Sequence, residues 1–116
     1  KQRIKKRWNK QLEGLGMCET MLQDITRMGI AAFTNSNLKD YEAIAKQMND
    51  YYLPGIQRQI LMLIYEAHCA QQQNAVYDGV IAQLVQLHQI VKKAKSYLNK
   101  KINEEEITQD DKSWKN

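Results

Sequence analysis

Residues 54–73 read PGIQRQILMLIYEAHCAQQQ and hold the clearest structural signal in the chain. Pro54 has no backbone N–H and disfavours a helical conformation at Leu53, so we expect a helix from Pro54 to about Gln73. Apolar residues recur there at intervals of three and four: Ile56, Ile60, Leu61, Leu63, Ile64, Ala67 and Cys69. Their surface is too wide for a single stripe, which predicts the central and most buried helix of a bundle.

The sequence on either side predicts three more helices. A stripe with a period near 3.6 runs through Ile4, Trp8, Leu12, Leu15, Cys18, Leu22, Ile25, Met28 and Ala32. The polar residues 34–37 end this helix, and a short amphipathic helix follows from about Leu38 to Tyr51. Residues 76–102 keep a seven-residue apolar rhythm, which predicts a long last helix. Glycine and proline are scarce and no residues alternate as in strands, so we expect an all-α, mostly antiparallel bundle of about four helices.

The bulk properties indicate one domain. A chain of 116 residues supports a single modest core, which we assign to residues 1–103. Residues 104–116 are acidic and polar, with Trp114 the one large aromatic residue, and are expected to form a mobile tail or linker. Two distant cysteines, no secretory signal and no long apolar run indicate a soluble, cytoplasmic protein without a membrane span. Because the chain opens on Lys1 and a basic run, we interpret it as a piece of a larger protein.

Positive charge is concentrated near the two ends of the chain. Residues 1–10 hold six Lys or Arg residues and no acid, and residues 92–103 hold five lysines and no acid. Such clusters bind phosphate backbones by releasing counterions. The candidate contacts with nucleic acid or a partner are Arg3, Lys5, Lys6, Arg7, Lys10, Lys92 and Lys93. Two alternatives stay open: the later lysines complement a helix dipole, and residues 1–10 lie against a neighbouring domain.

No residue pattern predicts chemistry. His68 and Cys69 are adjacent, so on a helix they point about 100° apart and do not converge on one ion. We therefore expect no metal site, no cofactor and no small-molecule substrate in this chain, and no nucleophile with a nearby base indicates an enzyme. Tyr51 and Tyr52, beside Pro54, are interpreted either as an aromatic recognition surface or as packing between two helices.

Two blocks of residues point to a family. The first comprises Gly14-Leu15, then Leu22-Gln23-Asp24-Ile25, then Arg27-Met28-Gly29-Ile30. The second comprises Ala45, Met48, Asp50, Pro54, Gly55, Ile56 and Arg58. In this order and spacing they resemble the helical region that follows the zinc finger in bacterial SWIM zinc finger proteins. The resemblance spans about residues 12–66 and departs at Met21, where that family tends to have tryptophan.

The resemblance implies a helical accessory domain that mediates protein or nucleic-acid contacts without catalysis. It places zinc in a finger elsewhere in the parent protein, because the Cys-x-Cys and Cys-x-His ligand pairs do not occur here. The structural signature it implies is Asp24, Arg27, Gly29, Asp50, Pro54, Gly55 and Arg58. We expect Gly29 to allow a close helix approach and the four charged residues to form a polar network. The alternatives are an autonomous nucleic-acid-binding domain that uses the basic ends, and a module that self-associates through the last helix.

Overall fold

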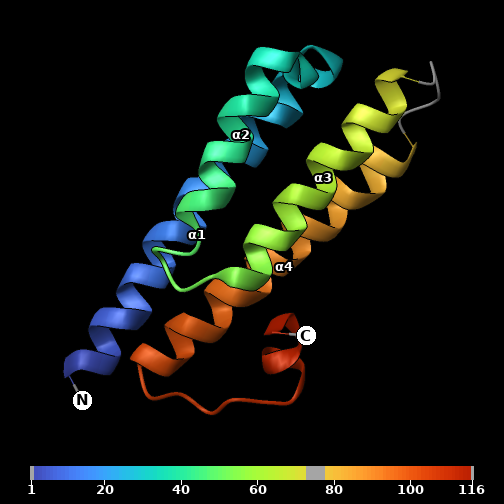
Figure 1. The fold of residues 1–116 in the computed structure, drawn as a ribbon. Coiled ribbons are helices and arrows are strands. Elements are labelled where there is room, and N and C mark those ends of the chain that lie inside the picture. The colour runs from blue at the N-terminus through green and yellow to red at the C-terminus, as the bar shows by residue number, and fades with distance from the viewer. Residues whose placement is uncertain (1, 73–77, 116) are drawn as a thin grey trace.

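The computed structural model describes residues 2–72 and 78–115 and contains four α-helices and two short 3₁₀ helices. The elements are α1 (Gln2–Met28), η1 (Gly29–Phe33), α2 (Asn35–Gln47), α3 (Pro54–Gln72), α4 (Asp78–Ile102) and η2 (Asp110–Lys115). Successive helices alternate in direction, and α1 and α3 each pack against both α2 and α4 (Figure 1). The described residues contain no strand. The predicted all-α, antiparallel four-helix bundle is therefore confirmed.

The first helix ends earlier than its apolar stripe predicts. The stripe runs to Ala32, but α1 stops at Met28 because Gly29 adopts a left-handed conformation with φ of 66°. Residues 29–33 then form η1, which carries the buried side chains of Ala32 and Phe33 back onto the core. Gly29 therefore serves to end the helix.

Helix α2 begins at a side-chain cap. The hydroxyl oxygen of Thr34 accepts a hydrogen bond from the backbone N–H of Asn37, and the helix starts at Asn35, three residues before the predicted Leu38. After Gln47 the chain continues in turns to Tyr52. The backbone N–H of Leu53 donates to the Met48 carbonyl and that of Tyr52 to the Asn49 carbonyl. These two bonds define a Schellman motif whose left-handed residue is Tyr52, with φ of 60°.

Helix α3 begins at Pro54, as predicted, and contributes Ile56, Ile60 and Leu63 to the core. The outer face of α3 is open to solvent, since Leu61 on that face is 41% exposed. Helix α3 is therefore one of four helices around the core and is not enclosed on all sides. Helix α4 is the long last helix that the apolar rhythm predicted. Its predicted start at residue 76 lies outside the described residues. The core residues come from all four helices and include Leu15, Leu22, Leu38, Ile60, Leu87 and Leu98.

The C-terminal tail is folded onto the bundle, which differs from the mobile segment expected from its composition. After α4, η2 packs against that helix, and the Trp114 ring lies edge-on to the Tyr97 ring at 5.8 Å between centroids. A reciprocal cap begins η2: the Asp111 carboxylate accepts from the Thr108 backbone N–H, and the Thr108 hydroxyl accepts from the Asp111 N–H. The carboxylates of Asp110 and Asp111 thus anchor the tail through ion pairs with Lys93 and Lys100 of α4.

Within the described residues, no helix has both the length and the hydropathy that a membrane span requires.

Candidate functional site

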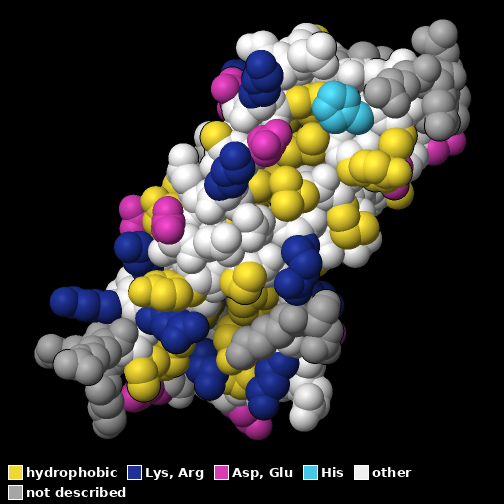
Figure 2. All heavy atoms as spheres, viewed as in Figure 1, with side chains coloured by type: hydrophobic (Ala, Val, Ile, Leu, Met, Phe, Trp, Pro, Cys, Tyr) yellow, Lys and Arg dark blue, Asp and Glu magenta, His cyan; other side chains and the backbone are white. Residues whose placement is uncertain are grey.

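The two basic segments of the sequence meet at one end of the bundle. Helix α1 begins where α4 ends, so Lys5 and Trp8 border the same hollow as Lys101. In Figure 2, dark-blue side chains gather in the lower half of the molecule, around the beginnings of α1 and α3 and the end of α4. Antiparallel packing thus combines charge from residues more than ninety positions apart into one basic end.

Acidic partners neutralise some of these cations. The Nζ atoms of Lys93, Lys95 and Lys100 lie 3.2, 3.0 and 3.0 Å from carboxylate oxygens of Asp110, Glu19 and Asp111. Over residues 2–72 and 78–115, seven cations of the basic end have no carboxylate within 4.0 Å: Lys5, Lys6, Arg7, Lys10, Arg58, Lys92 and Lys101. Of the predicted contacts, Lys93 is therefore paired, whereas Lys5, Lys6, Arg7, Lys10 and Lys92 are available. The side chain of Arg3 lies outside the described residues.

Aromatic rings hold two of the available cations in place. The Arg7 guanidinium lies 4.7 Å from the centroid of the Tyr52 ring, and Lys10 Nζ lies 5.9 Å from that of Tyr51. Both tyrosines belong to the turns that precede α3, and the Gln11 amide donates a 3.0 Å hydrogen bond to the Tyr52 carbonyl. Cation–π contacts orient a guanidinium while leaving its N–H donors free. Tyr51 is half-buried against α1, so it packs, whereas Tyr52 is 46% exposed and forms part of the surface.

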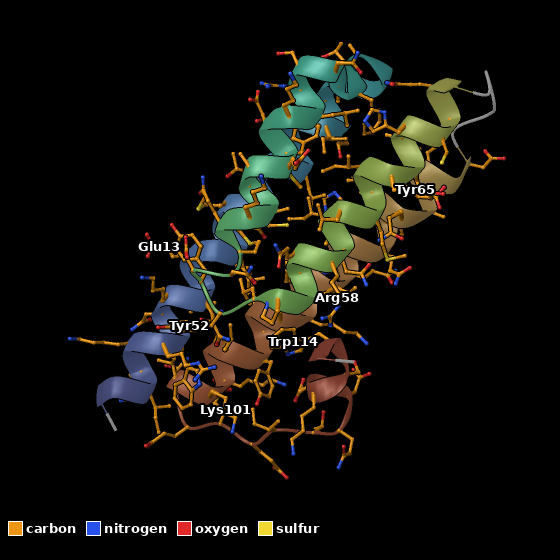
Figure 3. All side chains as sticks on the ribbon, viewed as in Figure 1. Glu13, Tyr52, Arg58, Tyr65, Lys101 and Trp114 are labelled. Atoms are coloured by element: carbon orange, nitrogen blue, oxygen red, sulfur yellow. The ribbon has the colours of Figure 1, made fainter. Side chains whose placement is uncertain are left out.

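A cavity of about 360 Å³ opens at the beginning of α3. Five segments line it: α1 with Arg7 and Gln11, the turn at residues 52–53, the first two turns of α3, α4 with Ile90, and η2 with Trp114. Figure 3 shows Tyr52, Arg58 and Trp114 around the first turn of α3. Among the described residues, the lining has two arginines and no carboxylate.

The backbone at this point is also electropositive. The first helical hydrogen bond of α3 runs from the Gln57 N–H to the Leu53 carbonyl, so the N–H groups of Gly55 and Ile56 precede it. No acidic residue lies in the first turn of α3. The Arg58 side chain folds back along this turn, since its Nη2 would be 3.9 Å from a Cβ atom on Gly55. The helix dipole and the guanidinium therefore raise the potential in the same place.

The residues of the implied structural signature divide between two parts of the molecule. Pro54, Gly55 and Arg58 line the cavity, whereas Asp24, Arg27 and Gly29 lie at the other end of α1 and Asp50 lies in the turns before α3. Asp24 and Arg27 form an exposed ion pair at 3.0 Å. Within the described residues no ion pair connects them to Asp50 or Arg58, so the predicted polar network is not present there.

Gly14, rather than the predicted Gly29, permits a close approach of another segment to α1. A Cβ atom placed on Gly29 would have no neighbour within 4 Å among the described residues, whereas a Cβ on Gly14 would meet Tyr51. Gly14 lies on the face of α1 that the turns before α3 cross. The prediction that Gly29 allows a close approach was therefore wrong. Gly29 instead adopts the left-handed backbone conformation that ends α1.

The cysteines and histidines do not gather into a reactive cluster in the described residues. Burial, with a smaller contribution from the charge of Glu19, raises the pKa of the Cys18 thiol to about 12. Its thiol is therefore protonated at neutral pH and packs as a small apolar group. In the part of the chain that the structure describes, no three His, Cys, Asp or Glu side chains gather around a position for one metal ion.

Trp114 and Gln11 are among the cavity residues that sequence reasoning missed. Trp114 was assigned to a tail, although Thr108-x-x-Asp111 is a capping-box pattern that predicts a helical turn ahead of it. Gln11 carries no recognisable signal, because its role is a hydrogen bond to a carbonyl 41 residues away. Long-range contacts of this kind follow from the packing of the helices.

Fold and site define a small helical-bundle domain with an electropositive end and a cavity at the start of its third helix. The chain belongs to the SWIM-associated four-helix bundle domain family, whose model matches residues 6–109. The match extends the resemblance seen at residues 12–66 through the whole of α4. No curated protein and no solved structure matches this chain.

Proposed function

We propose that this bundle is a non-catalytic interaction domain of a SWIM-type zinc finger protein and that its basic end binds the phosphate backbone of nucleic acid. The observation that carries the proposal is the convergence of two distant basic segments at one end of the bundle. Seven cations there have no carboxylate within 4.0 Å in the described residues. In this proposal any zinc resides in the finger of the parent protein.

The charge arrangement supports a polyanionic partner. Each phosphate neutralised by a lysine or arginine releases a condensed counterion, so affinity falls steeply with salt. Lysines already paired, such as Lys95 with Glu19, contribute little to this effect because their charge is compensated. The available cations lie on α1, α3 and α4, which gives an extended surface rather than a single point of contact.

A salt titration tests the proposal. Fluorescence anisotropy with labelled single-stranded and duplex oligonucleotides should give a linear fall of log K with log salt between about 50 and 200 mM. The double variant Lys5→Gln/Lys6→Gln should reduce the slope by about 1.4 to 1.8, since each lost phosphate contact removes about 0.7 to 0.9. Lys39→Gln is the matched control, because Lys39 lies in the first half of α2 at the other end of the bundle.

Two results would contradict the proposal: affinity that does not change with salt, or an equal loss in Lys39→Gln. The first removes counterion release as the source of binding. The second shows that net charge alone, rather than the basic end, decides the affinity.

Self-association is a second candidate function, supported by exposed apolar side chains. On the outer face of α3, Leu61, Met62 and Tyr65 are 41, 49 and 67% exposed, and on α4 Ile81 and Val85 are 57 and 50% exposed. Figures 2 and 3 show apolar surface around Tyr65, on the same face as Arg58. Sedimentation equilibrium decides this candidate: a dimer lost in Tyr65→Ser assigns contact to α3, and one lost in Ile81→Ser assigns it to α4. A monomer at all concentrations removes it.

A further inference from the structure

The cavity at the beginning of α3 differs in its charge from four other hollows of the described surface. The groove between α1 and α2 includes Asp24 and Asp40, and the hollow beside Lys92 and Lys93 includes Asp110. The two smaller hollows contain Glu19 or Glu104. Carboxylates repel an anion at each of those places, whereas the described lining of the cavity at α3 presents two arginines without an acid.

Arg7 and Arg58 approach the cavity from different helices. Arg7 is held on the Tyr52 ring, and Arg58 lies along the first turn of α3 beside Gly55. A phosphate group carries several acceptor oxygens and suits the planar fork of a guanidinium. The N–H groups of Gly55 and Ile56, which precede the first helical hydrogen bond, add donors at the same place. Donors suited to an oxyanion therefore line one cavity from both helices.

The rest of the lining is apolar or aromatic. Tyr52, Leu53, Ile56, Ile90 and Trp114 contribute the remaining surface, apart from two glutamine side chains. A volume of about 360 Å³ lies within the range of small-molecule pockets. Aromatic rings beside a cationic groove are the arrangement by which proteins bind the bases of single strands. A base inside a duplex is stacked and paired, so it does not enter such a cavity.

The backbone of Tyr52 gives independent support. Its φ of 60° is a conformation that glycine adopts without strain and that a bulky aromatic residue adopts at a cost. Strained backbone conformations of this kind cluster at ligand-binding sites. Its ring is 46% exposed, so burial does not compensate for the strain. This conformation ends the turns after α2 in the Schellman motif and places the exposed Tyr52 ring in the lining of the cavity.

We propose that this cavity binds one nucleotide of a single-stranded nucleic acid, with its phosphate between Arg7 and Arg58 and its base against the Tyr52 ring. The inference rests on the proposed function and deepens it, because it names the strand type and the residues that select it. The general basic end then supplies affinity, and the cavity supplies preference for a single strand.

Binding of matched single-stranded and duplex oligonucleotides tests the preference. Tyr52→Gly should weaken single-strand binding about tenfold, the usual effect of losing one stacked base, with duplex binding unchanged. Arg58→Gln should weaken single-strand binding more than Lys39→Gln does. Tyr52→Phe keeps the ring and should bind as the wild type. Because glycine suits the left-handed conformation, Tyr52→Gly should keep the wild-type unfolding midpoint, which separates recognition from folding.

A direct readout uses a mononucleotide as the probe. Adenosine monophosphate at millimolar concentration should shift the NMR signals of the Gly55 and Ile56 amides and of the Trp114 indole, and Arg58→Gln should abolish the shifts. Inorganic phosphate alone should shift the two amides and leave the indole signal in place. No shift with either probe overturns the cavity as a nucleotide site.

The two proposals fail in different ways. Oligonucleotide binding that is lost in Lys5→Gln/Lys6→Gln but kept in Tyr52→Gly and Arg58→Gln overturns the cavity and leaves the basic end as the binding surface. Mononucleotide shifts without any oligonucleotide binding overturn the proposed function and, with it, single-strand recognition, and leave the cavity as a site for free nucleotides only. Equal loss of single-strand and duplex binding in Tyr52→Gly also counts against the cavity.

Discussion

Gly14 of α1 and Tyr51 lie so close that a Cβ atom on the glycine would be 2.6 Å from Cβ of the tyrosine. The same atom would be 2.9 Å from Tyr51 Cγ and 3.0 Å from Leu53 Cδ1. Because a Cβ cannot move independently of its backbone, Gly14→Ala should displace the turns before α3. We predict a loss of about 1–3 kcal/mol in the free energy of unfolding, measured by urea denaturation.

Gly16 supplies the matched control on the same helix. A Cβ there would meet nothing within 4 Å among the described residues, and alanine is the better helix former. Gly16→Ala should therefore raise the free energy of unfolding by about 0.5–1 kcal/mol. If both variants changed stability by the same amount and in the same direction, close packing at Gly14 would not explain its effect.

Gly29 is constrained by its backbone conformation rather than by close packing. No described residue crowds a side chain at this position, yet its φ of 66° disfavours any residue with a Cβ. We predict that Gly29→Ala lowers the free energy of unfolding by about 1–2 kcal/mol, and that Gly29→Asn lowers it less, because asparagine tolerates this conformation. Thermal unfolding followed by circular dichroism measures both; a larger loss with Asn than with Ala would contradict the explanation.

Asp111 should control whether η2 stays on the bundle. Its carboxylate accepts hydrogen bonds from the Thr108 backbone N–H and from Lys100 Nζ, and these bonds lower its pKa. Because the pKa of Asp111 is lowered in the folded state, its carboxylate stabilises the docked tail at pH values above the ordinary pKa of 3.8. This stabilisation is lost as the pH falls through the folded-state pKa. Asp111→Asn should release η2 at neutral pH, seen as a red shift of Trp114 fluorescence in a Trp8→Phe background. An unshifted spectrum would show that Trp114 packing alone holds the tail.

The indole of Trp114 gives a second test of the same tail. Its Nε1 is buried and has no hydrogen-bond partner among the described residues, an arrangement that costs about 1–3 kcal/mol. Trp114→Phe removes this N–H and keeps an aromatic ring against Tyr97, so thermal stability should change little. Trp114→Ala removes the ring as well and should lower the unfolding midpoint. Equal losses in both variants would mean that the N–H is satisfied in solution.

Alkaline pH should destabilise the fold through Cys18. Its pKa rises from an ordinary 9.0 to about 12 in the folded state, so the folded chain holds the thiol proton more tightly than the unfolded chain does. This stabilisation is complete below pH 9.0 and is lost as the pH rises towards 12. At about pH 10 the loss from this group should be on the order of 1 kcal/mol by urea denaturation. Cys18→Ala removes the titrating group and should lack this part of the alkaline loss.

Local signals predicted the helices well, and they failed where distant residues meet. Apolar periodicity located all four helices, and Pro54 marked the start of α3 to the residue. The close approach was assigned to Gly29 instead of Gly14, because sequence does not reveal which glycine faces another segment. The fold of the tail depends on lysines of α4 that form ion pairs with Asp110 and Asp111. These pairs cannot be inferred from the composition of the tail.

The candidate site was predictable in its parts but not in its assembly. The basic residues and the Pro54-Gly55 and Arg58 positions were recognised separately, one set as charge and the other as structure. Their meeting depends on α1 crossing the turns before α3, which brings Arg7 onto Tyr52. No local pattern encodes a contact between residues 45 positions apart, so the cavity emerged only with the fold.

The short length of α2 has a consequence for the order of folding. It packs beside the second half of α1, so the first half depends for cover on the turns before α3 and on α4, as at the hollow that Trp8 shares with Lys101. Closing so long a loop costs entropy before its contacts form, and such contacts form slowly. During synthesis, the first half of α1 therefore waits until α4 has been made, and the basic end becomes a single surface only when α4 packs against α1.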